Sequence, residues 1–423
     1  MILQQRHNMF FPPQFVGTAS GANNSPLLGQ TQKFQIDRTY PLEEIRIHVN
    51  FTVASGGLTL NSTLATADQF DNILSLIQHV NLSVNDGKQP RSVVDCDGVA
   101  LLEYQAATGV NFDRATANVL ALSQLAAMPA GNYRLTYRIP LVETWIGEPL
   151  RSQMYLPVHT YPQDPVLTLQ FQNASNIYSA GNINFVGAEI QLIRRVPTLK
   201  SEKWVQSRAA SNPNGYIDFD LIETGFAVPV GTSSEIRFQL PIPGQYATLL
   251  CRHYLGGSTV SRKEIDSGAT GSSFGNENRW RLESAQVTIR EWRWKHLLAE
   301  LQMNQPGFAF VNPSVFVAAT SAGSPTTALQ AQQPIYGRIG GGGFPSGSGF
   351  DYANSVLMNF LTDGMSGDDA VELGSLLDCN TPASAGLKME IVGTPANVAT
   401  NASYLKVMGR RYFGNLARWQ SIA

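Results

Sequence analysis

Charge is scarce in this sequence. Lys, Arg, Asp and Glu make up 15% of the 423 residues, against about 25% in typical soluble domains. The formal net charge is −2, from 30 basic and 32 acidic residues, and no basic run is longer than two residues. Because neutralising nucleic-acid phosphates requires clustered Lys and Arg, we expect no direct nucleic-acid binding. A surface poor in charge favours a component of an assembly over a free monomer.

Cysteine and long apolar runs are also scarce. The three cysteines, Cys96, Cys251 and Cys379, are odd in number and far apart, and they form no Cys-x-x-Cys pair. A disulfide framework and a cysteine metal site are therefore excluded. No run of about 18 apolar residues is present, so we expect no membrane-spanning helix. Residues 1–8 lack a charged region followed by an apolar stretch, and we expect no secretion by that route.

The patterns of common catalytic and metal sites are missing as well. The six histidines never form the His-x-His pair of a two-domain metalloenzyme. The segment Asp95-Cys-Asp97-Gly98 resembles the start of a calcium loop but lacks the Glu that closes one. No Gly-x-Ser-x-Gly elbow occurs, and the glycine-rich segment 337–344 lacks the Lys-Ser/Thr of a phosphate loop. We therefore predict no catalytic residue, no cofactor-binding residue and no metal ligand.

The chain instead contains many short segments in which apolar and polar residues alternate. This period of two is typical of half-buried β-strands. The segments are 34–36, 45–53, 80–84, 133–139, 167–171 and 188–192 in the first half, and 217–221, 236–242, 287–294, 387–391 and 405–407 in the second. Between residues 287 and 294 the alternation slips by one residue, as a β-bulge would produce. Helical patterns are few, mainly within 99–127 and 295–303, which predicts an all-β protein.

Length and sequence breaks predict two domains. A chain of 423 residues suits two domains of about 200 residues each. We predict an N-terminal arm at 1–30, a first sandwich at 31–197, a linker at 198–214, a second sandwich at 215–415 and a C-terminal tail at 416–423. The Gly- and Ser-rich segments 256–279 and 319–350 are longer than most loops of compact domains, which predicts exposed projections.

The predicted arm contains an aromatic and proline-rich segment. Pro12 and Pro13 interrupt regular structure there. Met9, Phe10, Phe11 and Phe15 are candidates for contacting a neighbouring subunit or a membrane. The alternative is that the segment packs against its own domain.

The order of features recurs in the two halves. Residues 44–47 match 235–238, the strand at Val80 matches the strand at Val287, and 167–171 match 387–391. The last strand ends in an arginine pair in both halves, at 194–195 and at 410–411. Each match is weak because short alternating strands resemble one another, but the shared order predicts a duplicated sandwich.

In this organisation the chain resembles the double jelly-roll major capsid proteins of tailless icosahedral viruses with an internal membrane. The resemblance covers residues 31–415 and rests on two eight-strand-sized halves, a short linker, a strand followed by a helix in each half, long loops and an arm. No diagnostic motif supports it, so it identifies no site residue.

The resemblance implies two tandem eight-stranded jelly-roll β-sandwiches with short helices and long loops. It also implies a structural protein of the virion, not an enzyme, that is assembled in the host cytoplasm. Its partners are then further copies of itself, in trimeric pseudo-hexagonal capsomers, together with penton or minor capsid proteins and an internal viral membrane.

Two other functions stay open. One is a carbohydrate- or receptor-binding sandwich protein such as a spike, since Trp280, Trp292 and Trp294 can stack on sugars or bases as well as pack in a core. The other is a glycan hydrolase on a duplicated sandwich, which needs two carboxylates flanking the scissile bond. Acidic residues gather at 363–372, although Asp368 and Asp369 also suit the first turn of a short helix.

Overall fold

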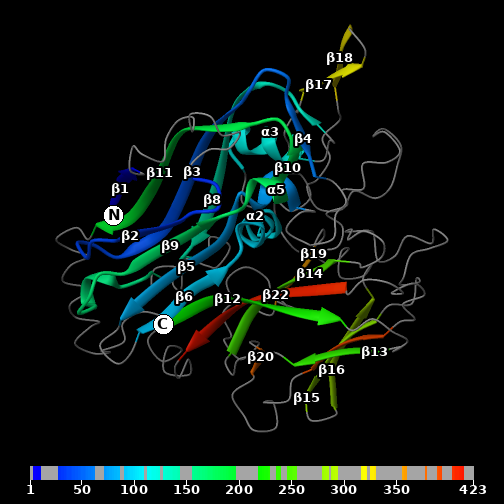
Figure 1. Cartoon of the computed structure of the whole chain (residues 1–423). Coiled ribbons are helices and arrows are strands. Elements are labelled where there is room, and N and C mark those ends of the chain that lie inside the picture. The colour runs from blue at the N-terminus through cyan, green and yellow to red at the C-terminus, as the bar shows by residue number, and fades with distance from the viewer. Residues whose placement is uncertain are drawn as a thin grey trace.

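The structure is a computed structural model of the chain. It describes residues 3–10, 27–61, 71–85, 90–108, 112–123, 127–142, 155–196, 218–228, 235–239, 245–254, 279–284, 287–293, 316–321, 324–329, 355–359, 377–378, 388–392 and 403–413. Within these residues the chain is built of β-sheets with few short helices, as the many segments of alternating apolar and polar residues predict (Figure 1).

The first half of the chain forms two antiparallel sheets, with the strand orders β1-β11-β3-β8 and β2-β9-β5-β6. The bounds of these strands are β1 Leu3–Phe10, β2 Thr31–Gln35, β3 Leu42–Val53, β5 Ile77–Asn85, β6 Pro90–Cys96, β8 Gly131–Pro140, β9 Val166–Phe171 and β11 Ile183–Val196. Strand β3 shows why they pack as a sandwich. Ile45, Ile47 and Val49 are buried, while Arg46 and His48 point to the other side of the sheet and are half-buried.

The second half repeats this arrangement, with the strand orders β12-β22-β14-β19 and β13-β21-β15-β16. The bounds are β12 Asp218–Val228, β13 Glu235–Gln239, β14 Gln245–Tyr254, β15 Arg279–Ser284, β16 Val287–Arg293, β19 Ser355–Asn359, β21 Lys388–Val392 and β22 Ser403–Phe413. A short strand, β20 (Leu377–Asp378), adds to β14.

The remaining elements are small. They are the three-stranded sheet of β10 (Tyr178–Ala180), β4 (Leu58–Leu60) and β7 (Ala127–Met128), the hairpin of β17 (Phe316–Ser321) and β18 (Ser324–Leu329), and the helices η2 (Asn72–Ser75), α2 (Gly98–Ala107), α3 (Arg114–Leu122), η3 (Val158–Thr160) and α5 (Ala174–Ile177). The hairpin lies apart from the sheets of both sandwiches and overlaps the start of the segment 319–350, for which the sequence predicts a projection (Figure 1). No described helix is long and apolar enough to cross a membrane.

The two sandwiches have the same strand order and connectivity. When the eight sheet-forming strands of each half are numbered in chain order, both halves contain one sheet with the order 1-8-3-6 and one with the order 2-7-4-5. This is the wiring of a jelly roll, and it confirms the predicted fold class of two tandem eight-stranded jelly rolls.

The same β-bulges recur at the same places in both halves. Where β3 pairs with β11, Glu43 is the extra residue, and where β14 pairs with β22, Ala247 is the extra residue at the same point. A second shared bulge places Val93 of β6 opposite no residue of β5, and Ile289 of β16 opposite no residue of β15. The second bulge confirms the slip in alternation predicted between 287 and 294. Because bulges fix the register, they allow the two halves to be compared residue by residue.

This comparison corrects part of the predicted repeat. The matches of β9 with β21 and of β11 with β22 are confirmed as elements. The match of 44–47 with 235–238 is wrong, because β3 is the third strand of its half and β13 is the second. The match of Val80 with Val287 is also wrong, because β5 is a fourth strand and β16 is a fifth. Short strands with the same alternation carry no information about which partner they pair with.

Strand β1 lies in the segment 1–30 that the sequence sets apart as an arm. Its eight residues pair with β11 in unbroken antiparallel register, from Leu3 opposite Val196 to Phe10 opposite Glu189. The first jelly roll is complete only with this strand, which forms the outer edge of its sheet. The boundaries predicted at 197, 215 and 415 fall outside the described residues, as does the linker at 198–214.

Candidate functional site: the joint between the two sandwiches

The two sandwiches are joined edge to edge. Strand β6, at the edge of the first sandwich, pairs in parallel with β12 of the second, with Leu221 opposite Val94 and Ile222 opposite Asp95. One continuous sheet therefore runs through both halves, in the order β19-β14-β22-β12-β6-β5-β9-β2 (Figure 1). Because only these two residue pairs are described between β6 and β12, side chains provide most of the contact.

A cluster of buried charges lies beside this edge. The Arg252 side chain, from β14, is fully buried, and its Nη2 atom donates to Asp97 Oδ2 at 2.6 Å and to the carboxylate of Glu223 from β12. Glu103 Oε2, from α2, lies 3.7 Å from Arg252 Nε. Lys406, from β22, donates from Nζ to Asp97 Oδ2 at 2.9 Å. Asp97 and Glu103 belong to the first sandwich and the other three to the second, so the cluster crosses the joint.

Asp97 also fixes the start of helix α2. It stands one residue after β6, and its Oδ1 atom accepts from the backbone N–H of Ala100 at 2.7 Å, as a helix-capping side chain does. Its own backbone N–H donates to Glu223 Oε2 at 2.9 Å. The segment in which the sequence offered a weak calcium-loop pattern thus holds a carboxylate that binds an arginine and a lysine instead.

Among the described residues, the cluster contains three carboxylates and two cations, and this imbalance acts on their protonation. Burial alone would raise the pKa of Asp97, but the charges of Arg252 and Lys406 and their hydrogen bonds outweigh it and hold that pKa well below the ordinary range. The pKa of Glu223 is raised by burial and by the negative charge of Asp97, against the opposing effect of Arg252 and Lys406. Glu223 is therefore the carboxyl of this pair that takes up a proton first as the pH falls.

A second buried arginine locks the joint at its other side. Arg410, from β22, is fully buried and donates to the carbonyl oxygens of Pro140 at 2.9 Å and Leu141 at 3.0 Å, at the end of β8 in the first sandwich. Its guanidinium also lies 4.4 Å from the centre of the Phe219 ring, within cation–π range. In the shared register, the first sandwich has Ile193 at this position.

The rest of the joint is apolar. The outer side of the β12-β22-β14-β19 sheet faces the first sandwich, and Leu250, Leu357 and Met408 on it are buried. On the same side, the Thr248 hydroxyl lies 3.3 Å from the hydroxyl of Tyr104 in α2. Because β14 is buried on both sides, its sequence does not alternate, and this strand could not be read from period two.

The corresponding side of the first sandwich's β1-β11-β3-β8 sheet is polar. Glu44 accepts from Arg138 Nη2 at 2.5 Å and from Arg46, and these two arginines outweigh the effect of burial and lower the pKa of Glu44. His48 faces out as its alternation predicts, with Nδ1 at 3.0 Å from Thr136 Oγ1, and its burial lowers its pKa.

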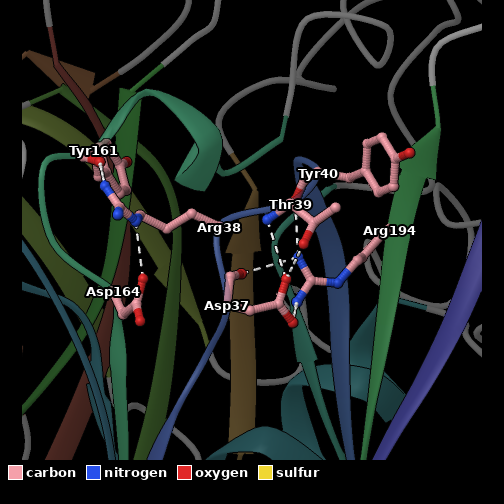
Figure 2. A network of polar contacts seen from close by, with 7 residues as sticks. All are labelled: Asp37, Arg38, Thr39, Tyr40, Tyr161, Asp164 and Arg194. Carbon is pink, nitrogen blue, oxygen red and sulfur yellow. Dashed lines mark hydrogen bonds and ion pairs between the residues drawn. The ribbon is translucent and has the colours of Figure 1, made fainter.

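A third buried arginine closes one end of the first sandwich (Figure 2). Arg194 donates from Nη1 to the carbonyl oxygens of Asp37 and Tyr40, both at 3.1 Å, and from Nη2 to Asp37 Oδ2 at 2.8 Å. Next to it, Arg38 Nε donates to Asp164 Oδ1 at 2.8 Å, and both side chains of this pair are exposed. These contacts fix the turn between β2 and β3. In the shared register Arg194 corresponds to Arg411, which pairs with buried Asp220.

The residues predicted to contact a neighbour or membrane do not form one described group. Met9 lies in β1 opposite Ile190 and is half-buried against the core. Phe10 ends the same strand opposite Glu189. Phe11 and Phe15 lie outside the described residues, as do the acidic residues at 363–372.

The other candidate residues are scattered. Trp280 and Trp292 stand opposite each other on β15 and β16, while Trp294 lies beyond the described part of the chain. Among the described residues, no group of three or more His, Cys, Asp or Glu side chains is placed to hold a metal ion. Cys96 and Cys251 are buried, and burial raises the pKa of both thiols.

Comparison with known proteins gives a fold but no sequence family. No family model and no curated protein sequence matches the chain. The structure is similar to that of the major capsid protein of STIV, the Sulfolobus turreted icosahedral virus, with a TM-score of 0.55 and 15% identity over 99% of both chains. The chain has the fold of that capsid protein.

Two further similarities are weaker. The major capsid protein P2 of bacteriophage PM2 gives a TM-score of 0.48 with 8% identity, over 97% of this chain and 99% of that one. VP54 of PBCV-1, fitted into a reconstruction of the virophage Sputnik, gives a TM-score of 0.49 with 10% identity, over 97% and 94%. The assignment of the double jelly-roll fold therefore rests on the STIV protein and on the strand wiring.

Proposed function

We propose that the chain is the major structural protein of an icosahedral viral capsid and that it assembles as a homotrimer. The observation that carries this proposal is the joint. Two identically wired sandwiches are held by a shared sheet and by buried ion pairs, which makes one chain a rigid block with two similar lobes. Three such blocks in a ring present six similar lobes, which suits a lattice position of pseudo-sixfold symmetry.

The shared fold supports the same role. The protein of known structure with a TM-score of 0.55 to this chain is a major capsid protein, and the similarity extends over 99% of both chains. The buried charges of the described joint bind one another across the two sandwiches, as a structural role requires.

The direct test is to purify the chain and measure its mass in solution by light scattering, then image it by electron microscopy. We expect a trimer that forms larger ordered shells or sheets at high concentration. A monomer that never assembles would contradict the proposal. Turnover of an oligosaccharide by that monomer would favour the hydrolase alternative, and glycan binding by an isolated oligomer that forms no shells would favour the spike alternative.

The remaining partners follow from the proposed role. The virion is then the location of the protein, assembly takes place in the host cytoplasm, and penton or minor capsid proteins occupy the lattice positions that a trimer cannot fill. Contact of Met9, Phe10, Phe11 and Phe15 with a neighbouring subunit or an internal viral membrane is part of the same proposal. Flotation of the trimer with phospholipid vesicles tests the membrane contact. Replacement of Phe11 and Phe15 by Ser is then expected to reduce flotation, and unchanged flotation would contradict a role for these rings.

A further inference from the structure

The joint within the chain combines two different surfaces. One is an edge surface, formed in the first sandwich by strand β6, with Asp95, and by Asp97 directly after it. The other is a face surface, formed in the second sandwich by the edge of β12 and the outer side of its sheet, with Arg252 and Lys406. Because the two sandwiches have the same strand order, each has a strand edge and a sheet face at the corresponding positions. The joint uses the edge surface of the first sandwich and the face surface of the second. The edge surface of the second sandwich and the face surface of the first therefore take no part in the joint.

The shared bulges identify the residues of these remaining surfaces. Counting from the bulges at Glu43 and Ala247, His48 of the first sandwich corresponds to Arg252, and Glu189 corresponds to Lys406. Counting from the bulges at Val93 and Ile289, the positions of Asp95 and Asp97 correspond to Glu291 and Arg293.

The charges at one pair of positions are exchanged. Within the chain, acidic Asp97 of the edge surface binds basic Lys406 of the face surface at 2.9 Å. At the corresponding positions of the remaining surfaces stand basic Arg293 and acidic Glu189. Both signs have reversed together, so the pair stays complementary.

The remaining surfaces also contain two strand edges. Within the described residues, β1 pairs only with β11, and β16 pairs only with β15. They correspond to β12 and β6, which pair with each other in the joint. Strand edges left open are prone to pair with another chain, and proteins normally cover them.

The difference in polarity between the two face surfaces fits the order in which they are buried. Leu250, Leu357 and Met408, which are buried when the chain folds, correspond to Arg46, Arg138 and Gln191 of the first sandwich. Polar groups keep a surface hydrated until a second chain arrives, whereas a surface buried during folding can be apolar throughout.

We propose that the joint is repeated between chains. The face surface of the first sandwich, with His48 and Glu189, receives the edge surface of the second sandwich of another copy, with β16 placed parallel to β1 and Arg293 paired with Glu189. This contact is head to tail and forms a ring when it closes. It rests on the proposed capsid function, for which it specifies the surfaces that hold the trimer together.

Charge exchange tests the proposal. Glu189→Arg and Arg293→Glu each place like charges across every contact of the ring, and we expect each to raise the concentration at which the trimer dissociates by at least about tenfold. The double variant restores opposite charges in reversed order and is expected to return most of the lost affinity. Lys33→Glu reverses an exposed charge on β2, in the opposite sheet, and is the matched control that leaves the trimer unchanged.

Sedimentation velocity over a range of concentrations measures the trimer, and far-ultraviolet circular dichroism checks that each variant is folded. Rescue by the double variant supports the contact even if a single variant folds poorly. A wild-type trimer that both single variants leave unchanged, or single variants that dissociate without rescue in the double variant, would overturn the proposed contact and leave the capsid function standing. A wild-type chain that is monomeric at all concentrations would overturn both.

Discussion

Removal of the Arg252 guanidinium is the sharpest test of the joint. In Arg252→Met the methionine fills most of the same space, but Asp97, Glu103 and Glu223 are left in the cluster, where Lys406 is the cation that remains among the described residues. Breaking a buried ion pair by removing one partner typically costs about 3–5 kcal/mol. We therefore expect the free energy of unfolding to fall by that amount at pH 7.

Protonation provides a second estimate of the same cost. One proton taken up by a carboxyl group restores the net charge that the cluster has in the wild type. For a carboxyl with an ordinary pKa of 4.5, protonation at pH 7 costs about 3.4 kcal/mol, and at pH 5.5 it costs about 1.4 kcal/mol. The destabilisation by Arg252→Met is therefore expected to shrink by about 2 kcal/mol between these two pH values.

Urea unfolding at pH 7 and at pH 5.5, followed by tryptophan fluorescence and circular dichroism, measures both quantities. The matched control is Arg38→Met, which removes the exposed ion pair with Asp164 and one hydrogen bond to the Tyr161 carbonyl, and is expected to cost about 1 kcal/mol. An effect of Arg252→Met no larger than that of the control, or one that does not depend on pH, would show that the cluster does not hold the sandwiches together.

Three further outcomes follow from the same contacts. Arg410→Leu leaves two carbonyl oxygens of the first sandwich without their charged donor, so urea unfolding is expected to show a loss of about 2–3 kcal/mol, and a loss below about 0.5 kcal/mol would contradict this role. Glu223 has a raised pKa in the folded chain, so its contribution is fully present below its unfolded pKa and is lost as the pH rises through the folded one. Glu223→Gln is therefore expected to gain stability relative to the wild type between pH 5 and pH 8, and a constant difference in urea midpoints would refute the assignment. Asp37→Asn keeps the two carbonyl contacts of Arg194 but removes its charged partner, which is half exposed, so calorimetry is expected to show a loss of about 1 kcal/mol, and an unchanged melting temperature would count against the network in Figure 2.

Strands with one buried side and one less buried side can be predicted from the sequence, and strands buried on both sides cannot. Residues 45–53 alternate because one side of β3 packs on the core and the other does not. In β14, every residue from Tyr246 to Arg252 is buried, so the alternation disappears. Strand β1 gives no such pattern for a different reason: it is a polar edge strand that precedes a proline pair, so the sequence predicts an arm there.

The residues of the joint could not be found in this way. Asp97 belongs to a segment that resembles a calcium loop, and no pattern in the sequence marks Arg252. The pair is separated by 155 positions in the chain. The arginine pairs at 194–195 and 410–411 were a partial signal, because they mark the last strand of each half. Arg194 and Arg411 occupy corresponding positions, whereas Arg410 lies in the joint and corresponds to Ile193.

The sequence by itself determined that this protein is all-β, duplicated and poor in charged residues. Composition, the period of apolar residues and the order of the segments can all be read directly from the chain. The tertiary structure alone decided which strand lies beside which, where the extra residue of each bulge falls, and which edge of one sandwich meets which face of the other. The physical reason is that alternation records only whether a side chain is buried. The identity of the group that buries it depends on contacts between distant segments, which no local pattern contains.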